Sequence, residues 1–228
     1  MLFKPEQLIE LSHPLLADKE CFPYHPYPAG YTSPKRWYIE TLCMMCSHIG
    51  THIEVPFHKD EHGMDCKDWP LEKLIGEAVV INVLGKQPKE PITLEDVKKY
   101  EGSIHEGDFI FLYTGYDQYF HTDNWQPYPH IAEDALAWML SFKPKAIGTD
   151  ASGIELPGID TQELTGEPNH VACFQNGTAI IESLTNLGAI EHCRTTVFVL
   201  IPMAEQMDAF PARTVTIILL KQRSPGVL

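Results

Sequence analysis

Residues 47–58 concentrate side chains that bind divalent metal ions. His48, His52, Glu54 and His58 all occupy even positions, whereas the odd positions are mostly apolar. In an extended chain alternate residues lie on opposite faces, so one face would be buried and the other would present three imidazoles and a carboxylate. Such groups are typical zinc ligands. The alternative, a half-buried strand with incidental histidines, suits a lone histidine better than three on one face.

This segment cannot run straight if its histidines share an ion. At about 3.3 Å per residue, His48 and His58 would lie about 33 Å apart in an extended strand. Ligand bonds are only about 2.1 Å long, so the chain must bend. Gly50 and Pro56 interrupt the segment where a bend would bring its ligands together.

The pattern H-x-G-T-H-x-E-x-P-x-H resembles the signature of the cyclase family of metal-dependent hydrolases, which includes bacterial kynurenine formamidases and isatin hydrolases. That signature usually has Asp where this chain has Glu54. Weaker similarity to the family extends over most of the chain, in residues 76–83, 92–96, 107–116, 148–150 and 208–213.

The resemblance implies a site and a reaction. His48, His52 and Glu54 would bind one divalent ion, zinc or manganese. His170 and Glu182 would bind a second ion or complete the shell of the first, and His58 would be the general acid/base. The ion would lower the pKa of bound water, and the resulting hydroxide would attack the carbonyl of a small amide, an arylformamide or a cyclic amide, to cleave its C–N bond.

Two alternatives remain open. The same metal site could serve lactone hydrolysis or a cyclising dehydration. A metal- or ligand-binding protein that has lost catalysis is also possible, because Glu54 is one methylene longer than Asp and could displace an ion by about 1 Å.

Three residues are candidates for holding a substrate. Trp37 and the tyrosine-rich segment before it could line an aromatic pocket, or simply pack in the core. Asp150 follows a predicted strand, where it could face the substrate or support a ligand. Arg213 could hold a substrate carboxylate, or pair with a surface acid.

The elements that must position these residues form one strand-rich domain of mixed α and β structure over residues 1–228. Continuous apolar runs predict strands buried on both faces, at residues 78–84, 108–113, 146–149, 195–201 and 214–220. Helices are expected at residues 93–100, with Thr93 as the cap, and 131–140. The resemblance adds a barrel-like, swivelling β/β/α core with flanking helices.

Composition restricts the partners. The formal net charge of −14 disfavours nucleic acid and anionic membranes. The small-molecule substrate is what the family resemblance implies. The first residues do not form a signal peptide, so a cytoplasmic protein is expected. Cys43 and Cys46 lie in an apolar run and are expected as reduced thiols of a buried strand. Residues 18–36 are expected to form a long, well-packed loop, and the family resemblance implies a homo-oligomer, a dimer or tetramer.

Overall fold

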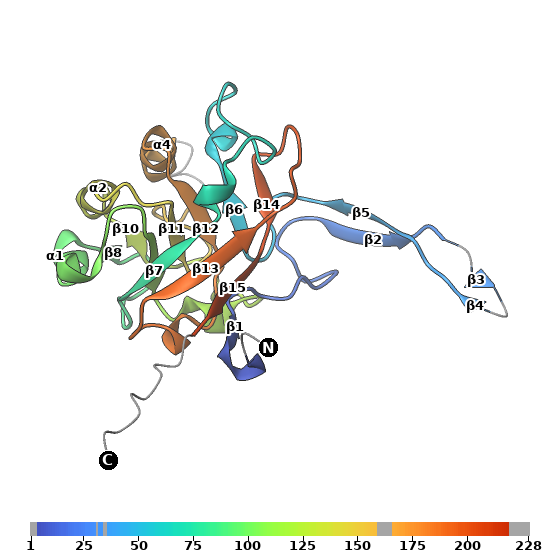
Figure 1. Cartoon of the computed structure of the whole chain (residues 1–228), viewed down its shortest axis with the longest axis horizontal. Helices are drawn as coiled ribbons and strands as arrows, with labels where there is room; N and C mark the ends of the chain where they lie inside the picture. The colour runs from blue at the N-terminus through green and yellow to red at the C-terminus, as the bar shows by residue number, and fades with distance from the viewer. Residues whose placement is uncertain (1–3, 31, 34–35, 159–165, 219–228) are drawn as a thin grey trace, which may run out of the picture.

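A nine-stranded mixed sheet carries the fold, with strands in the order β1-β15-β13-β7-β9-β11-β12-β6-β14 (Figure 1). The computed structural model describes residues 4–30, 32–33, 36–158 and 166–218. The strands of this sheet are β1 (Leu8–Glu10), β6 (His52–Glu54), β7 (Ile75–Asn82), β9 (Phe109–Tyr113), β11 (Ala146–Thr149), β12 (Ala179–Glu182), β13 (Thr195–Leu200), β14 (Ala209–Pro211) and β15 (Arg213–Ile217).

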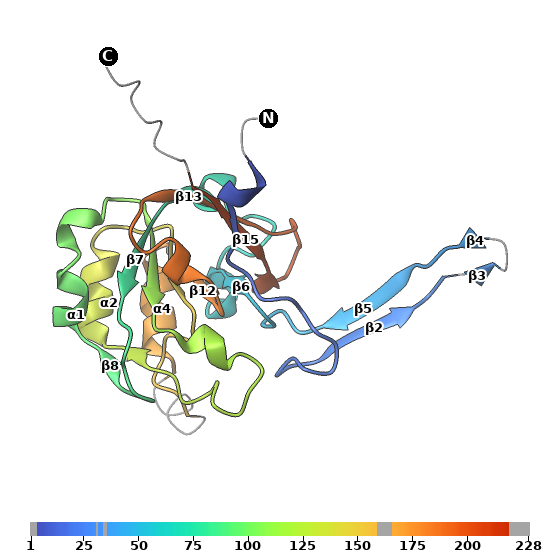
Figure 2. The same cartoon turned by 90° about the horizontal axis from the view of Figure 1, so that it is seen from below.

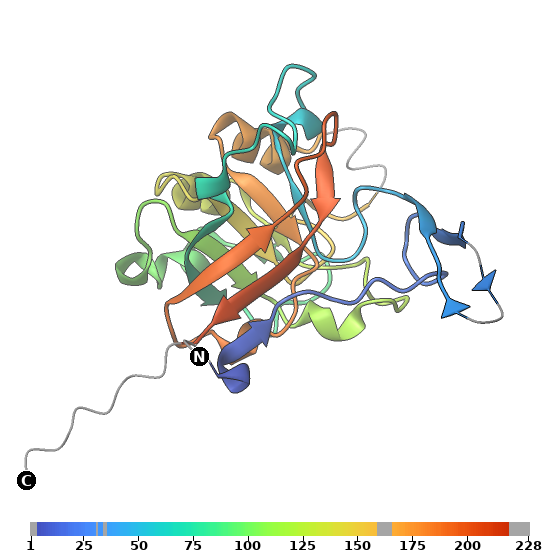
Figure 3. The same cartoon turned by 45° about the vertical axis from the view of Figure 1, so that its right-hand side comes forward.

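The centre of the sheet is parallel and its edges are antiparallel. Strands β7, β9, β11 and β12 run parallel to one another, whereas β13 and β6 pair antiparallel on either side of them. The sheet curls into a half-barrel, and the neighbouring strands β13 and β15 lie at the front of it in Figure 3. The expected strand-rich α/β class is confirmed.

The central strands are buried on both faces, as their continuous apolar runs predict. Ala78 and Val80 of β7 pack in one hydrophobic cluster with Phe109, whereas Val79 and Ile81 pack in another. Because adjacent residues point to opposite faces, both faces of the strand are covered and neither needs polar side chains.

Among the residues that the structure describes, three α-helices cover one face of the sheet, on the side opposite the projecting arm in Figure 2. They are α1 (Leu94–Lys98), α2 (Glu133–Leu140) and α4 (Pro168–Gln175). The predicted cap of α1 is present, since the hydroxyl of Thr93 accepts a hydrogen bond from the backbone N–H of Asp96 and the Asp96 carboxylate accepts one from the N–H of Thr93. No helix in the described ranges is both long and apolar enough to cross a membrane.

A hairpin arm extends away from this body (Figures 1 and 2). Its base is β2 (Tyr24–Pro28) paired with β5 (Thr41–Met45), and its tip is β3 (Thr32–Ser33) paired with β4 (Arg36–Trp37). A two-stranded ribbon of β8 (Pro91–Ile92) and β10 (His130–Ile131) lies elsewhere, on the body.

Two sequence predictions about this region are wrong. Residues 18–36 do not form a well-packed loop, because much of this segment belongs to the arm. The strand containing Cys43 exists, but Cys43 is exposed and Cys46 only half-buried. The reason is that β5 leaves the body and, among the described strands, pairs only with β2, so the core does not cover its apolar residues. The cysteines are free.

Candidate metal centre

The segment from His48 to His58 bends as its glycine and proline require. Gly50 has a φ of 55°, in the left-handed region, and β6 then runs for only three residues. Pro56 begins a 3-10 helix that ends at His58. As a result the ring centroids of His48 and His58 are 4.5 Å apart, not the roughly 33 Å of a straight strand.

The register of β6 against β12 brings the second part of the site to the first. His52 lies directly opposite Glu182, and cross-strand partners share one face of a sheet. Nε2 of His52 is 3.7 Å from a carboxylate oxygen of Glu182 and 3.2 Å from Oε1 of Glu54. The strand pairing alone therefore places His52 and Glu182 side by side, although they are 130 positions apart in the sequence.

His170 enters from α4, and a second carboxylate sets its orientation. Glu155 accepts a hydrogen bond from the backbone N–H of His170 at 2.9 Å and another from its Nδ1 at 3.1 Å. The other ring nitrogen, Nε2, then faces Glu54 at 3.3 Å and Glu182 at 3.7 Å. In the same way Nδ1 of His52 donates to the carbonyl of Gly50, which leaves Nε2 for the centre.

In the resulting centre, hydrogen-bond acceptors face one another, and a bound cation would stabilise this arrangement. When these rings are neutral and Nδ1 is the donor, the Nε2 atoms of His52 and His170 present lone pairs toward Glu54. Oε2 of Glu54 is buried and has no hydrogen-bond partner among the described residues. Glu54 and Glu182 are 2% and 7% exposed, so water does not solvate their carboxylates. The donor set therefore fits a divalent ion of the zinc or manganese kind.

The pKa shifts of the groups in this centre also indicate that its buried carboxylates require a compensating positive charge. Burial raises the pKa of Glu182 well above its usual value, and the neighbouring charge of Glu54 adds to the rise. Burial lowers the pKa of His48, but hydrogen bonds to Asp208 and Glu54 outweigh it and raise that pKa to about 10. Without an ion, protons on these groups supply the balancing charge, so ion binding must release protons.

Asp208 joins the site from the turn before β14. Its Oδ2 lies 2.8 Å from Nε2 of His48 and 2.9 Å from Nδ1 of His58. Burial raises the pKa of Asp208, but hydrogen bonds from these two histidines hold it well below its usual range. His58 is partly exposed, and its ligand atom also lies close enough to those of Glu54 and His170 for one ion to contact all three.

The structure thus brings together His48, His52, Glu54, His58, His170 and Glu182, all of which the sequence singled out. It does not bring Asp150 or Arg213, two of the three predicted substrate residues, to this cluster. Asp150 is fully buried and accepts hydrogen bonds from Thr114 and Gly115. Arg213 is 83% exposed and pairs with Glu10, and Trp37 belongs to β4 at the tip of the arm.

These positions correct two interpretations. Asp150 cannot face a substrate from within the core, so its role here is to tie the ends of two strands together. Arg213 follows the simpler explanation, pairing with a surface acid.

Sequence reasoning missed two residues of the site. Asp208 opens the block at residues 208–213 that resembles the family, so a signal was present there. Glu155 follows no recognisable motif, and its contact with His170 depends on a loop that only the fold brings to the start of α4.

The fold and this centre define a class of protein in which a curled mixed sheet carries a buried cluster of histidines and carboxylates that could hold a metal ion. The family model described as putative cyclase matches residues 9–156. The chain therefore belongs to the cyclase family.

Relatives and solved structures agree with that membership. The chain is 29% identical over 143 residues to a kynurenine formamidase of Erythrobacter litoralis (strain HTCC2594), covering 61% of this chain and 59% of the relative. It is 25% identical over 196 residues to the kynurenine formamidase of Bacillus mycoides (strain KBAB4), covering 79% and 83%. The matched region spans about six-tenths of the length of the first relatives.

The fold is similar to that of an isatin hydrolase bound to the product analogue thioisatinate, with a TM-score of 0.82, 15% identity, and 93% and 92% of the two chains covered. A structure described as a potential metal-dependent hydrolase with cyclase activity has a TM-score of 0.72 and 25% identity, with 92% and 96% covered.

Proposed function

We propose that this protein is a metal-dependent hydrolase that cleaves the C–N bond of a small amide, an arylformamide or a cyclic amide. The observation that carries the proposal is the convergence of His52, Glu54, His170 and Glu182 on one buried centre, where Oε2 of Glu54 has no hydrogen-bond partner among the described residues. The names of the relatives, kynurenine formamidase and isatin hydrolase, favour an amide over other carbonyl substrates.

The residues of the centre have two roles, metal binding and orientation of the metal-binding rings. His48, His52, Glu54, His170 and Glu182 would hold one or two divalent ions, which lower the pKa of bound water and polarise a carbonyl. Glu155 and the Gly50 carbonyl fix the rings of His170 and His52 so that each keeps Nε2 directed inward.

His58 is the residue we assign to proton transfer. Asp208 lies on its Nδ1, so the opposite nitrogen is free to exchange a proton with water or a leaving nitrogen. At 23% side-chain exposure His58 is more accessible than His52 or His170, as a group that meets the substrate must be.

Elemental analysis of purified wild type and of His52→Ala tests the site first. We expect one to two equivalents of zinc or manganese in wild type and loss of metal in the variant. An exposed histidine of the same region provides the control, His62→Ala, whose ring is 87% exposed and should keep the metal. A wild type that lacks metal and fails to bind added zinc or manganese would end the hydrolase proposal.

A substrate panel then separates the reactions open to this centre. The metal-loaded protein is offered aryl formamides, cyclic amides, esters and lactones of matched size. Hydrolysis of amides at the highest kcat/KM supports the proposal. A preference for lactones, or no turnover with full metal occupancy, contradicts it in favour of a lactone hydrolase or a binding protein.

A further inference from the structure

We infer that the hydroxyl of Tyr128 positions Glu182 in the metal centre by donating a hydrogen bond to its carboxylate. Tyr128 lies on the segment between β9 and β10 and is not one of the residues that would hold the ion. This role rests on the proposed metal-dependent function, because it supports one of the ligands of that centre.

Gly153 shows where the Tyr128 hydroxyl lies. A Cβ at position 153 would collide with this hydroxyl and would lie 2.9 Å from Cζ of the same ring. It would also lie 3.4 Å from Oε1 of Glu182. The hydroxyl and Oε1 therefore border the same small space over the Cα of Gly153. Because glycine has no Cβ, this space stays open and lets the phenol approach the carboxylate.

The carboxylate of Glu182 has room for such a donor. Its Oε2 is 3.7 Å from Nε2 of His52, and its Oε1 is 3.7 Å from Nε2 of His170. Both distances exceed the roughly 2.7–3.2 Å of an N–H···O hydrogen bond. A buried carboxylate that is ionised to bind a metal requires hydrogen bonds from its surroundings. A bond from Tyr128 to Oε1 would leave Oε2 directed at His52 and the centre.

The surroundings of Tyr128 keep its hydroxyl protonated and therefore able to donate. The residue is 4% exposed. Burial raises the pKa of the hydroxyl, and the negative charges of Glu182 and then Glu155 raise that pKa further. A neutral phenol is both donor and acceptor, whereas an ammonium or guanidinium group would bring a positive charge that competes with the ion. Tyrosine thus supplies a hydrogen bond to the ligand without repelling the metal.

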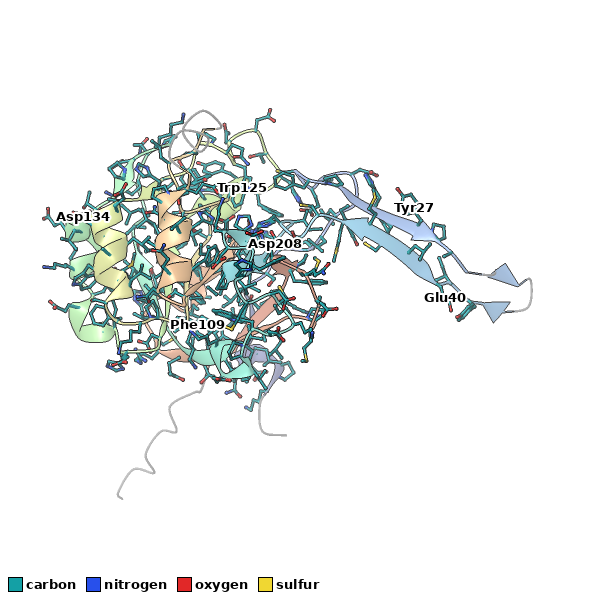
Figure 4. The ribbon with its side chains drawn as sticks, turned by 90° about the horizontal axis from the view of Figure 1, so that it is seen from above. Tyr27, Glu40, Phe109, Trp125, Asp134 and Asp208 are labelled. Atoms are coloured by element: carbon teal, nitrogen blue, oxygen red, sulfur yellow. The ribbon has the colours of Figure 1, made fainter. Side chains whose placement is uncertain are left out.

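An aromatic cluster fixes the position of this ring. Tyr128 packs with Trp125 and Ala151 in a buried cluster, and Figure 4 shows Trp125 in the body of the protein. The carbonyl of Ala151 accepts a hydrogen bond from the backbone N–H of Ser183, the residue after Glu182. The cluster is thereby tied to the end of β12 that carries the ligand. A ring already held by packing loses little conformational entropy when its hydroxyl forms a bond.

Titration of zinc against a chromogenic chelator tests this role. Tyr128→Phe removes only the hydroxyl and should bind zinc about 10-fold more weakly than wild type, as expected when a metal ligand loses a supporting group. Tyr116→Phe is the matched control, because Tyr116 belongs to the same cluster and is 6% exposed. Burial and then Tyr119 raise the pKa of Tyr116, rather than any carboxylate of the centre. This control should bind zinc as tightly as wild type.

Gly153→Ala distinguishes the proposed hydrogen bond from a general loss of packing. The added Cβ would displace the Tyr128 hydroxyl, so this variant should also bind zinc more weakly. In Tyr128→Phe/Gly153→Ala the hydroxyl is already absent. The two losses should therefore not add, and the affinity should stay within about 3-fold of that of Tyr128→Phe. Circular dichroism should show the wild-type fold in all variants.

The remaining outcomes would overturn this role. Wild-type zinc affinity in Tyr128→Phe would do so, as would additive losses in the double variant. At saturating zinc, Tyr128→Phe should recover the kcat of wild type, whereas a kcat that stays low would show that the hydroxyl acts on the substrate instead. A wild type that binds no zinc would overturn the metal centre together with this role. Unchanged affinity in Tyr128→Phe would overturn this role alone.

Discussion

Two hydrogen bonds connect Glu155 and His170. One carboxylate oxygen of Glu155 accepts both the backbone N–H and the ring Nδ1–H of His170, at 2.9 and 3.1 Å. The backbone bond satisfies a donor in the first turn of α4 that has no partner within the helix. The ring bond fixes which nitrogen faces the metal centre. A single buried side chain thus sets both the start of a helix and the direction of a ligand.

Removing this carboxylate should weaken metal binding without removing a ligand. We expect Glu155→Ala to lower zinc affinity by about 10–100-fold, the usual effect of losing a group that orients a metal-binding histidine. Glu155→Gln retains an acceptor oxygen and should lose less. Competition with a chromogenic chelator measures both. Wild-type affinity in Glu155→Ala would show that His170 needs no support.

Shortening Glu54 to the family's usual Asp should impair this chain. One oxygen of Glu54 contacts His48 at 2.9 Å and His52 at 3.2 Å, while the other faces His170 at 3.3 Å. Withdrawing the carboxylate by about 1 Å breaks this fit, and such a displacement can lower a rate by roughly 100-fold. We expect kcat/KM of Glu54→Asp to fall by that order.

The control for Glu54→Asp is Glu61→Asp, the same shortening at a carboxylate that is 88% exposed. Its activity should match wild type. A gain of activity in Glu54→Asp would instead show that Glu54 has degraded an ancestral site, and would favour the binding-protein alternative.

His58→Ala should separate metal binding from turnover. The buried ligands remain when His58 is removed, so metal content should stay at the wild-type level. Turnover of the amide identified by the panel should fall by about 10²–10⁴-fold, the usual contribution of a general acid/base. Elemental analysis and rate measurements on the same sample check both. Metal lost together with activity would make His58 a ligand and contradict its assignment.

His13 should make the stability of the metal-free protein depend on pH. Its ring stacks on Phe120 with centroids 3.9 Å apart, and burial lowers its pKa from 6.5 to about 4. The folded state therefore disfavours protonated His13. The stability associated with the neutral ring is complete above pH 6.5 and is lost as the pH falls toward 4.

Urea unfolding of wild type and His13→Phe measures this effect, since phenylalanine keeps the stacked ring and does not titrate. Between pH 7 and pH 5 the unfolding free energy of wild type should fall by about 1 kcal/mol more than that of the variant, a value reduced for the partial exposure of the ring. Chelator in both samples removes the effect of metal. Equal pH dependence would show that His13 does not titrate differently on folding.

Local chemistry allowed the sequence to determine much of this protein. The central strands follow from apolar runs that suit burial on both faces, and α1 follows from the reciprocal cap of Thr93 and Asp96. The alternation of residues 48–58, with Gly50 and Pro56, was enough to predict both a ligand face and the bend that closes it. These are short-range effects, decided within about one turn or one strand.

Only the tertiary structure decided which residues from distant segments of the chain come into contact in the site. The pairing of β6 with β12 sets His52 against Glu182, and a loop more than a dozen residues earlier brings Glu155 to His170. Cys43 shows the converse, since its apolar neighbours predicted burial and the arm exposes it. An apolar run predicts that a strand has a face to bury. Only the arrangement of the whole chain decides whether the protein's own core buries that face.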